Sequence, residues 1–234
     1  MFFLFFLACT NPQLVDGEAW EDDVDVYEEE VPAASGEDAD IYVIGDSVLD
    51  WFVGEGSVPE VVSESLDRPV VNAAVGGSHF LGGEDMDGIP SQYQEGPWGW
   101  LIMDGGANDL NDRCGCDDCD EVLDSILSED GTQGVMADFA TSVADSGVRV
   151  LIMGYYDIPV DAPDFEGCAP VMQQLSDRQS RLAQGHDGIT FADASRVMDG
   201  RDLSMYDEDM IHPSQDGCQT LGTFLADVIA REDE

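Results

Sequence analysis

From residue 41 onward, short apolar runs alternate with longer stretches in which apolar residues recur every three or four positions. The short runs are rich in β-branched and aromatic residues, which is typical of buried strands. The predicted strands are 41–44, 69–75, 100–103, 148–154 and 189–192. The longer stretches have the period of a helix, and the predicted helices are 58–66, 120–127, 135–146, 172–183 and 214–231.

The alternation of strands with helices indicates the fold class. Helices that connect successive strands form right-handed crossovers, which place the strands in a parallel sheet covered on both faces. We therefore predict one α/β domain over residues 41–234, with roughly five parallel strands. In such sheets ligands bind beyond the carboxyl ends of the strands, so the chemistry is expected at that edge.

The chain opens with an apolar run that ends at Cys9. The run is too short to span a bilayer, which needs about 20 apolar residues, and it fits the apolar part of an export signal. Cys9 follows Leu7 and Ala8 as in the cleavage box of a bacterial lipoprotein, so we predict a signal-like segment over residues 1–8 and lipidation of Cys9. A cleaved secretory signal and an apolar start without a targeting role are the alternatives.

Residues 9–40 are predicted to be a disordered acidic spacer. Between Thr10 and Asp40 there are twelve acidic residues and no basic ones, and Pro32 interrupts regular structure. A segment of this composition cannot contribute to a core and is most simply a solvated link between a membrane anchor and the domain.

The charge balance excludes several classes of partner. The chain has 51 Asp and Glu residues against 8 Arg and no Lys, a formal charge of −43. It cannot form the cationic surface that binds nucleic acid, and anionic lipid headgroups would repel it, so contact with a membrane is expected only through the lipid anchor. Adaptation to high salt and a genome poor in Lys codons both explain such a composition.

Four short motifs contain residues suited to acyl transfer. Three follow predicted strands: Gly45-Asp46-Ser47, the segment from Asn72 to Gly77, and Gly106-Ala107-Asn108-Asp109; the fourth is Asp209-Met210-Ile211-His212. A Ser hydroxyl needs a base such as His to take its proton, and the His needs an acceptor on its other nitrogen. The oxyanion that forms needs fixed N–H donors, each typically worth about 3 kcal/mol of the barrier.

These motifs, in this order, resemble those of GDSL-type esterases of the SGNH hydrolase superfamily. The resemblance implies a flavodoxin-like three-layer α/β/α sandwich and hydrolysis of a carboxylic ester without a metal or organic cofactor. It implies Ser47 as nucleophile, His212 as base and Asp209 as the carboxylate that orients the base. The oxyanion donors would be the backbone N–H groups of Ser47 and Gly77 and the side chain of Asn108.

Two features depart from the pattern of this superfamily. The first motif continues into an acidic region around Asp50, where small or apolar residues are usual, and a Cys-rich insert follows the third motif. They leave the acyl chain and the alcohol open, so the substrate is a small-molecule, lipid or carbohydrate ester, and the acidic charge favours a neutral one.

Other residues near these motifs have simpler explanations. Ser78 is a rival nucleophile, but its surroundings lack the final Gly of a nucleophile elbow. His79 is interpreted as a loop residue near the cleft and His186 as a solvated turn residue. Asp46 and Asp109 are predicted to tie loops together through hydrogen bonds.

The cysteines beyond Cys9 allow three interpretations. They are Cys114, Cys116, Cys119, Cys168 and Cys218. Disulfides are the default in an exported protein, a metal site would need a fourth ligand from far along the chain, and free thiols are the third option.

Two other functions remain open at this stage. A non-catalytic surface lipoprotein of the same fold could bind a glycan or a protein partner. A metal-storing acidic protein built around the Cys-rich insert would carry bound zinc.

Overall fold

The computed structural model describes residues 39–83, 87–159 and 162–234. The predicted signal-like segment, Cys9 and the spacer up to residue 38 lie outside the described residues. Within the described part, five strands form a parallel sheet in the order β2-β1-β3-β4-β5. The strands are β1 (Ile41–Ile44), β2 (Val70–Asn72), β3 (Trp100–Met103), β4 (Arg149–Gly154) and β5 (Ile189–Asp193).

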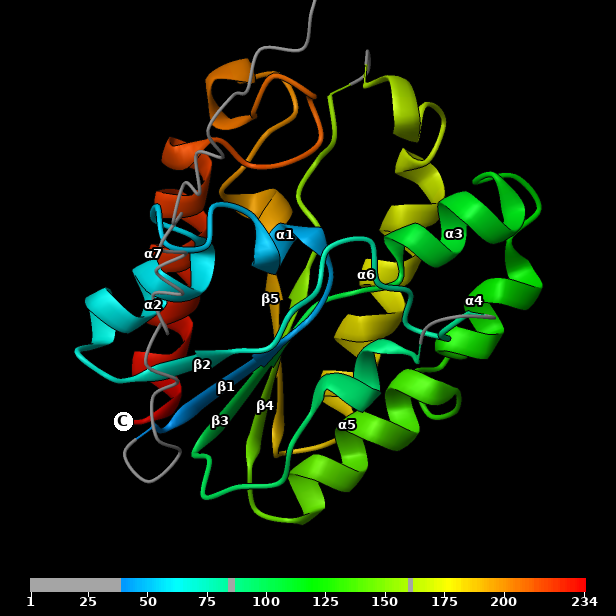
Figure 1. Cartoon of the computed structure of the whole chain (residues 1–234). Helices are drawn as coiled ribbons and strands as arrows, with labels where there is room; N and C mark the ends of the chain where they lie inside the picture. The colour runs from blue at the N-terminus through cyan, green and yellow to red at the C-terminus, as the bar shows by residue number, and fades with distance from the viewer. Residues whose placement is uncertain (1–38, 84–86, 160–161) are drawn as a thin grey trace, which may run out of the picture. The chain divides into compact units, whose positions relative to one another are not determined.

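Helices cover both faces of the sheet, as Figure 1 shows, with α2 and α7 on one face and α5 and α6 on the other. The α-helices are α1 (Ser47–Asp50), α2 (Val58–Leu66), α3 (Ala107–Cys114), α4 (Asp120–Ile126), α5 (Val135–Asp145), α6 (Ala169–Gln184) and α7 (Gln215–Glu232). Short 3₁₀ turns occupy Ile89–Gln92, Pro163–Phe165, Ala194–Arg196 and Leu203–Met205. The predicted α/β/α sandwich with a five-stranded parallel sheet is confirmed.

The central strands are apolar throughout because helices bury both of their faces. All four residues of β1 and all four of β3 are buried, whereas those of β2, at the edge, are half-buried. None of the helices in the described residues is both long and apolar enough to cross a bilayer.

Two predicted elements differ from the observed ones by three residues at one end. The second strand ends at Asn72 instead of residue 75, because the Asn72 side chain accepts a hydrogen bond from the Ala74 N–H and turns the chain. Helix α6 begins at Ala169, three residues before the predicted start, with Pro170 in its first turn, where proline is tolerated.

The end of the predicted spacer already belongs to the fold. Ala39 is buried, and the Asp40 carboxylate pairs with Arg68 and accepts a hydrogen bond from the Gly99 N–H at 3.1 Å. The ordered domain therefore includes two residues before the predicted boundary at 41.

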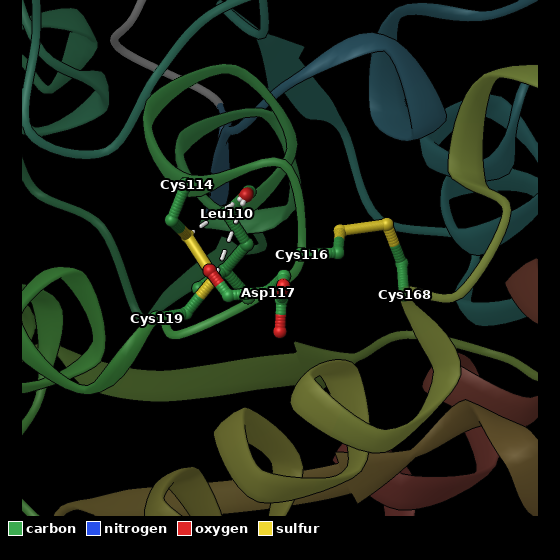
Figure 2. Close-up of a disulfide and its surroundings, with 6 residues drawn as sticks. All are labelled: Leu110, Cys114, Cys116, Asp117, Cys119 and Cys168. Atoms are coloured by element: carbon green, nitrogen blue, oxygen red, sulfur yellow. Dashed lines mark hydrogen bonds between the residues drawn. A yellow bond between two sulfur atoms is a disulfide. The ribbon is translucent and has the colours of Figure 1, made fainter.

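Four cysteines form two disulfides around the loop between α3 and α4. Cys114 bonds to Cys119, and Cys116 bonds to Cys168 at the start of α6 (Figure 2). The expectation of disulfides is confirmed, and these four thiols are not available to bind a metal. Cys218 is a buried free thiol, and burial raises its pKa to about 12.

Candidate active site

Ser47 lies directly beyond the carboxyl end of β1, as the first residue of α1. Asp46 caps this helix by accepting a hydrogen bond from the Val48 N–H at 3.1 Å. Position 45 requires glycine, because a Cβ there would lie 1.9 Å from Oδ1 of Asp104, the residue that follows β3. The Gly-Asp-Ser motif therefore fits a tight strand-to-helix turn at the centre of the sheet.

His212 lies within hydrogen-bond distance of both Ser47 and Asp209. Its Nε2 is 2.8 Å from the Ser47 Oγ, and its Nδ1 is 2.5 Å from an Asp209 carboxylate oxygen. The other Asp209 oxygen accepts hydrogen bonds from the N–H groups of Ile211 and His212, each at 2.9 Å. Although partial burial raises the pKa of Asp209, the hydrogen bonds from the His212 side chain and these N–H groups bring it below the ordinary value.

The three expected oxyanion donors lie around Ser47. Gly77 and Asn108 line the same cavity as Ser47. One Asn108 Nδ2 proton goes to the Ser78 carbonyl at 2.9 Å, which fixes the amide and leaves its second proton for a ligand. Gly77 has a φ of +74°, a conformation that side chains disfavour, so glycine suits this turn.

Asp50 holds the loop that carries Gly77. Its carboxylate accepts a hydrogen bond from the Gly76 N–H at 2.9 Å. The acidic residue that departs from the superfamily pattern therefore connects α1 to the loop after β2.

A pair of buried carboxylates lies behind Ser47. Asp104 accepts from the Asp46 N–H at 2.9 Å, and Asp46 accepts from the Tyr155 hydroxyl at 2.5 Å. The second oxygen of Asp104 has no hydrogen-bond partner among the described residues. Burial, together with repulsion by Asp46, raises the pKa of Asp104 well above its ordinary value, and burial also raises that of Asp46.

The rival residues have the structural roles that their positions suggested. Asp109 accepts hydrogen bonds from the N–H groups of Phe80 and Leu81, so it has the predicted hydrogen-bonding role but ties helix α3, not a second loop, to the loop after β2. His79 pairs with Asp112, and His186 is a partly exposed residue of the turn before β5. Ser78 is buried beside the site.

A mostly apolar cavity of about 380 Å³ opens at Ser47. Its apolar wall comes from the segment after β4, from α6 and from the loop before α7: Tyr155, Tyr156, Ile158, Phe165, Met172 and Ile211. Together, the hydroxyl, the imidazole with its carboxylate, the N–H donors and the cavity form an arrangement able to bind an acyl group and attack its carbonyl carbon.

A comparison with protein families shows which family the chain matches. The model of the GDSL-like lipase/acylhydrolase family matches residues 43–220, which include the four motifs. The chain belongs to the GDSL-like lipase/acylhydrolase family. The resemblance drawn from the motifs is therefore confirmed, and the family is one of enzymes that cleave acyl bonds. None of the curated proteins compared with the chain matches it.

Solved structures show the same fold as this GDSL-like chain at low sequence identity. A carbohydrate acetylesterase from Sinorhizobium meliloti aligns with a TM-score of 0.63 and 17% identity, over 82% of this chain and 99% of its own. The native aryl esterase of M. smegmatis aligns with a TM-score of 0.59 and 20% identity, over 82% and 99%. An α/β hydrolase from a Lake Arreo metagenome gives 0.61 and 16%, over 84% and 97%.

Sequence reasoning missed several residues of the GDSL-like site. Trp51 stacks on the His212 ring, and Tyr155 donates to Asp46. Gln92 bonds both backbone groups of Gly45, which holds the end of β1. Of these residues, only Trp51 could have been singled out from the sequence, because it adjoins Asp50, where the first motif departs from the superfamily pattern.

Proposed function

We propose that the protein is a serine esterase that hydrolyses a carboxylic ester through an acyl-Ser47 intermediate. One observation carries the proposal: a continuous chain of hydrogen bonds runs from the Ser47 hydroxyl through His212 to Asp209, with distances of 2.8 and 2.5 Å. This is the geometry that a nucleophile, its base and an orienting carboxylate require.

In the acylation step, His212 Nε2 accepts the Ser47 proton as Oγ bonds to the ester carbonyl carbon. The proton on His212 Nδ1 stays in its hydrogen bond to Asp209, which fixes the tautomer and stabilises the imidazolium. The carbonyl oxygen becomes an oxyanion and accepts from the N–H groups of Ser47 and Gly77 and from the free Asn108 proton. The tetrahedral intermediate then collapses, the alcohol leaves with the proton from His212, and an ester to Ser47 remains.

Deacylation repeats these steps with water. His212 removes a proton from a water molecule, the oxygen attacks the acyl carbon, and the same donors hold the second oxyanion. The intermediate releases the carboxylic acid, and the imidazolium returns its proton to Ser47 Oγ. Atoms balance as one ester and one water giving one acid and one alcohol.

The cavity favours a neutral ester with an apolar acyl group. Its wall of Tyr, Ile, Phe and Met side chains offers burial to hydrocarbon, while the acidic residues among the described residues of its lining are Asp46 and Asp164. The charge of −43 adds a repulsive field for anionic substrates.

Export of the protein is part of the proposal. Disulfides persist in oxidising compartments, and the two bridges around the α3–α4 loop favour such a location. Lipidation of Cys9 and the membrane anchor that it would provide follow from the sequence of the first residues and stay a prediction.

Substitution of the nucleophile tests the proposal. Ser47→Ala should lower kcat on nitrophenyl acetate by at least ~10⁴-fold and abolish labelling by a fluorophosphonate probe, while the thermal midpoint stays near that of the wild type. Ser78→Ala is the matched control, because this neighbouring serine should remain dispensable for labelling. Unchanged hydrolysis by Ser47→Ala would overturn the assignment, and a wild-type protein that never labels would favour a non-catalytic binding protein.

A further inference from the structure

Trp51 and His212 form the closest stacked ring pair in the described residues. Their ring centroids are 3.8 Å apart, and their planes differ by 7°. The indole therefore covers one face of the imidazole. The neighbouring aromatic pairs of the fold meet at larger distances, and Trp51 itself meets Phe52 edge to face at 6.0 Å.

Two hydrogen bonds that involve Asp207 connect the indole of Trp51 to the backbone of His212. Its Nε1 donates to an Asp207 carboxylate oxygen at 3.1 Å, and the Asp207 N–H donates to the His212 carbonyl at 2.9 Å. Asp207 and His212 thus belong to one closed turn, which holds the tryptophan and the histidine together. Rotation of the indole away from His212 would break its hydrogen bond to this turn.

Trp51 directly follows the short helix that the nucleophile begins. Ser47 is the first residue of α1, which ends at Asp50, and Trp51 is the C-cap residue with an extended backbone conformation. This short segment therefore places the Ser47 hydroxyl near Nε2 of His212 and the face of the Trp51 ring against the face of the imidazole.

The stack adds a constraint that the hydrogen bonds cannot supply. The bonds to Asp209 and Ser47 lie in the plane of the imidazole and leave the ring free to tilt about the line between them. The indole face opposes that tilt. In addition, an aromatic face attracts a cation placed over it, and tryptophan does so most strongly, so the stack favours the imidazolium over the neutral ring.

We propose that Trp51 is a positioning residue for the base, which holds the plane of the His212 ring and stabilises its protonated form. This inference rests on the proposed function for its effect on rate, but the contact itself acts on the imidazole whether or not an ester is hydrolysed. A readout on the imidazole can therefore separate failure of this inference from failure of the esterase proposal.

The test uses Trp51→Leu, which removes the aromatic face, and Trp51→Phe, which keeps a smaller one. The control is Val53→Ala, because Val53 lies in the same loop and is 56% exposed. Titration of the ring protons is followed by NMR; the chain has three histidines, so His79 and His186 are references in the same spectra. The other charged groups near the ring, Asp209, Asp46 and Asp207, are unchanged in every variant.

The expected result is a graded effect. Trp51→Leu should move the His212 titration midpoint down by about 0.5 to 1 pH unit and lower kcat/KM on nitrophenyl acetate ~3-fold to ~30-fold, with the acid limb of the profile moving to lower pH. Trp51→Phe should fall between Trp51→Leu and the wild type, and Val53→Ala should match the wild type. A shifted midpoint in a protein without esterase activity would support the contact and reject the proposed function. An unchanged midpoint and rate in a folded Trp51→Leu variant would overturn the role of Trp51.

Discussion

At the amino edge of the sheet, where the strands begin, Asp40 and Asp233 are paired with arginines. At the carboxyl edge, where the strands end, the aspartates nearest Ser47 accept hydrogen bonds from uncharged donors. Asp233 accepts from Arg68 at 2.8 Å and from Trp100 at 3.2 Å, and it also pairs with Arg149. The chain has only 8 Arg for 51 acidic residues, and the three charged pairs at this edge use two of them, Arg68 and Arg149.

At the carboxyl edge, N–H and O–H groups take the place of arginines as hydrogen-bond donors to the carboxylates. Asp46 accepts from Val48 and Tyr155, Asp104 accepts from the Asp46 N–H, and Asp50 accepts from the Gly76 N–H. A guanidinium among these carboxylates would repel the imidazolium that His212 must form. The comparison teaches that arginines stabilise the edge remote from the reaction, while neutral donors organise Asp46, Asp104 and Asp50 around Ser47, where a cation has to develop. The arginine on this side, Arg113, is paired with Asp109 in α3.

The two edges consequently respond to pH in opposite directions. Burial, with repulsion by Asp46, raises the pKa of Asp104 well above its ordinary value. Partial burial also raises the pKa of Asp233, but the hydrogen bond from Trp100 and the two guanidinium groups bring it below its ordinary value. Stability that depends on Asp104 declines as pH rises, and stability that depends on Asp233 declines as pH falls.

Among the substitutions that test the contrast between the two edges, the largest effect is expected where a neutral donor faces the oxyanion. Asn108→Ala should lower kcat by ~10²-fold to ~10³-fold, since it removes one donor from the developing charge, with little change in the thermal midpoint. Asn111→Ala, one turn further along α3, is the matched control and should keep wild-type kcat. Equal rates for Asn108→Ala and the wild type would remove Asn108 from the oxyanion site.

A middle-sized effect is expected from the buried carboxylate behind the nucleophile. Because the pKa of Asp104 is higher in the folded state than in the unfolded chain, the wild type loses stability as pH rises from about 4 toward the folded pKa, by up to ~1.4 kcal/mol per pH unit. Asp104→Asn imitates the protonated acid and cannot release a proton. Its free energy of unfolding should therefore fall less steeply than that of the wild type as pH rises above about 4 in urea titrations. Parallel curves for the two proteins would show that Asp104 does not titrate in this way.

The sequence was sufficient for the parts of the molecule in which local pattern and tertiary structure agree. The strand Trp100–Met103 was predicted with its observed limits, because a run buried on both faces has no polar residue that could blur its ends. Three of the four motifs lie together because parallel strands bring their carboxyl ends to one edge whatever lies between them. The fourth, in the loop before α7, places His212 at the same edge, within hydrogen-bond distance of Ser47.

Contacts between side chains distant in sequence were not predictable. The stack of Trp51 on His212 joins residues 161 positions apart (212 − 51), and the disulfide between Cys116 and Cys168 joins residues separated by 52 positions. Neither pairing leaves a periodic signal in the chain. The helix Ala107–Cys114 was missed for a local reason: its Asn and Asp residues favour turns when read without the packing of Leu110.

The smallest effect is expected at the amino edge, where solvent reaches the ion pairs. The Asp233 side chain is 32% exposed, so Asp233→Asn should lower the free energy of unfolding at pH 7 by only ~1 kcal/mol. Because the pKa of Asp233 is lower in the folded state than in the unfolded chain, its contribution is present above the unfolded value and disappears as pH falls through the folded one. The difference between Asp233→Asn and the wild type should therefore shrink as pH falls below about 4, the value in the unfolded chain, while kcat at pH 7 stays unchanged because Asp233 lies at the opposite end of the strands from Ser47. A difference that persists undiminished in acid would show that Asp233 acts through packing of its side chain and not through its charge, and the contrast between the two edges would then not be electrostatic.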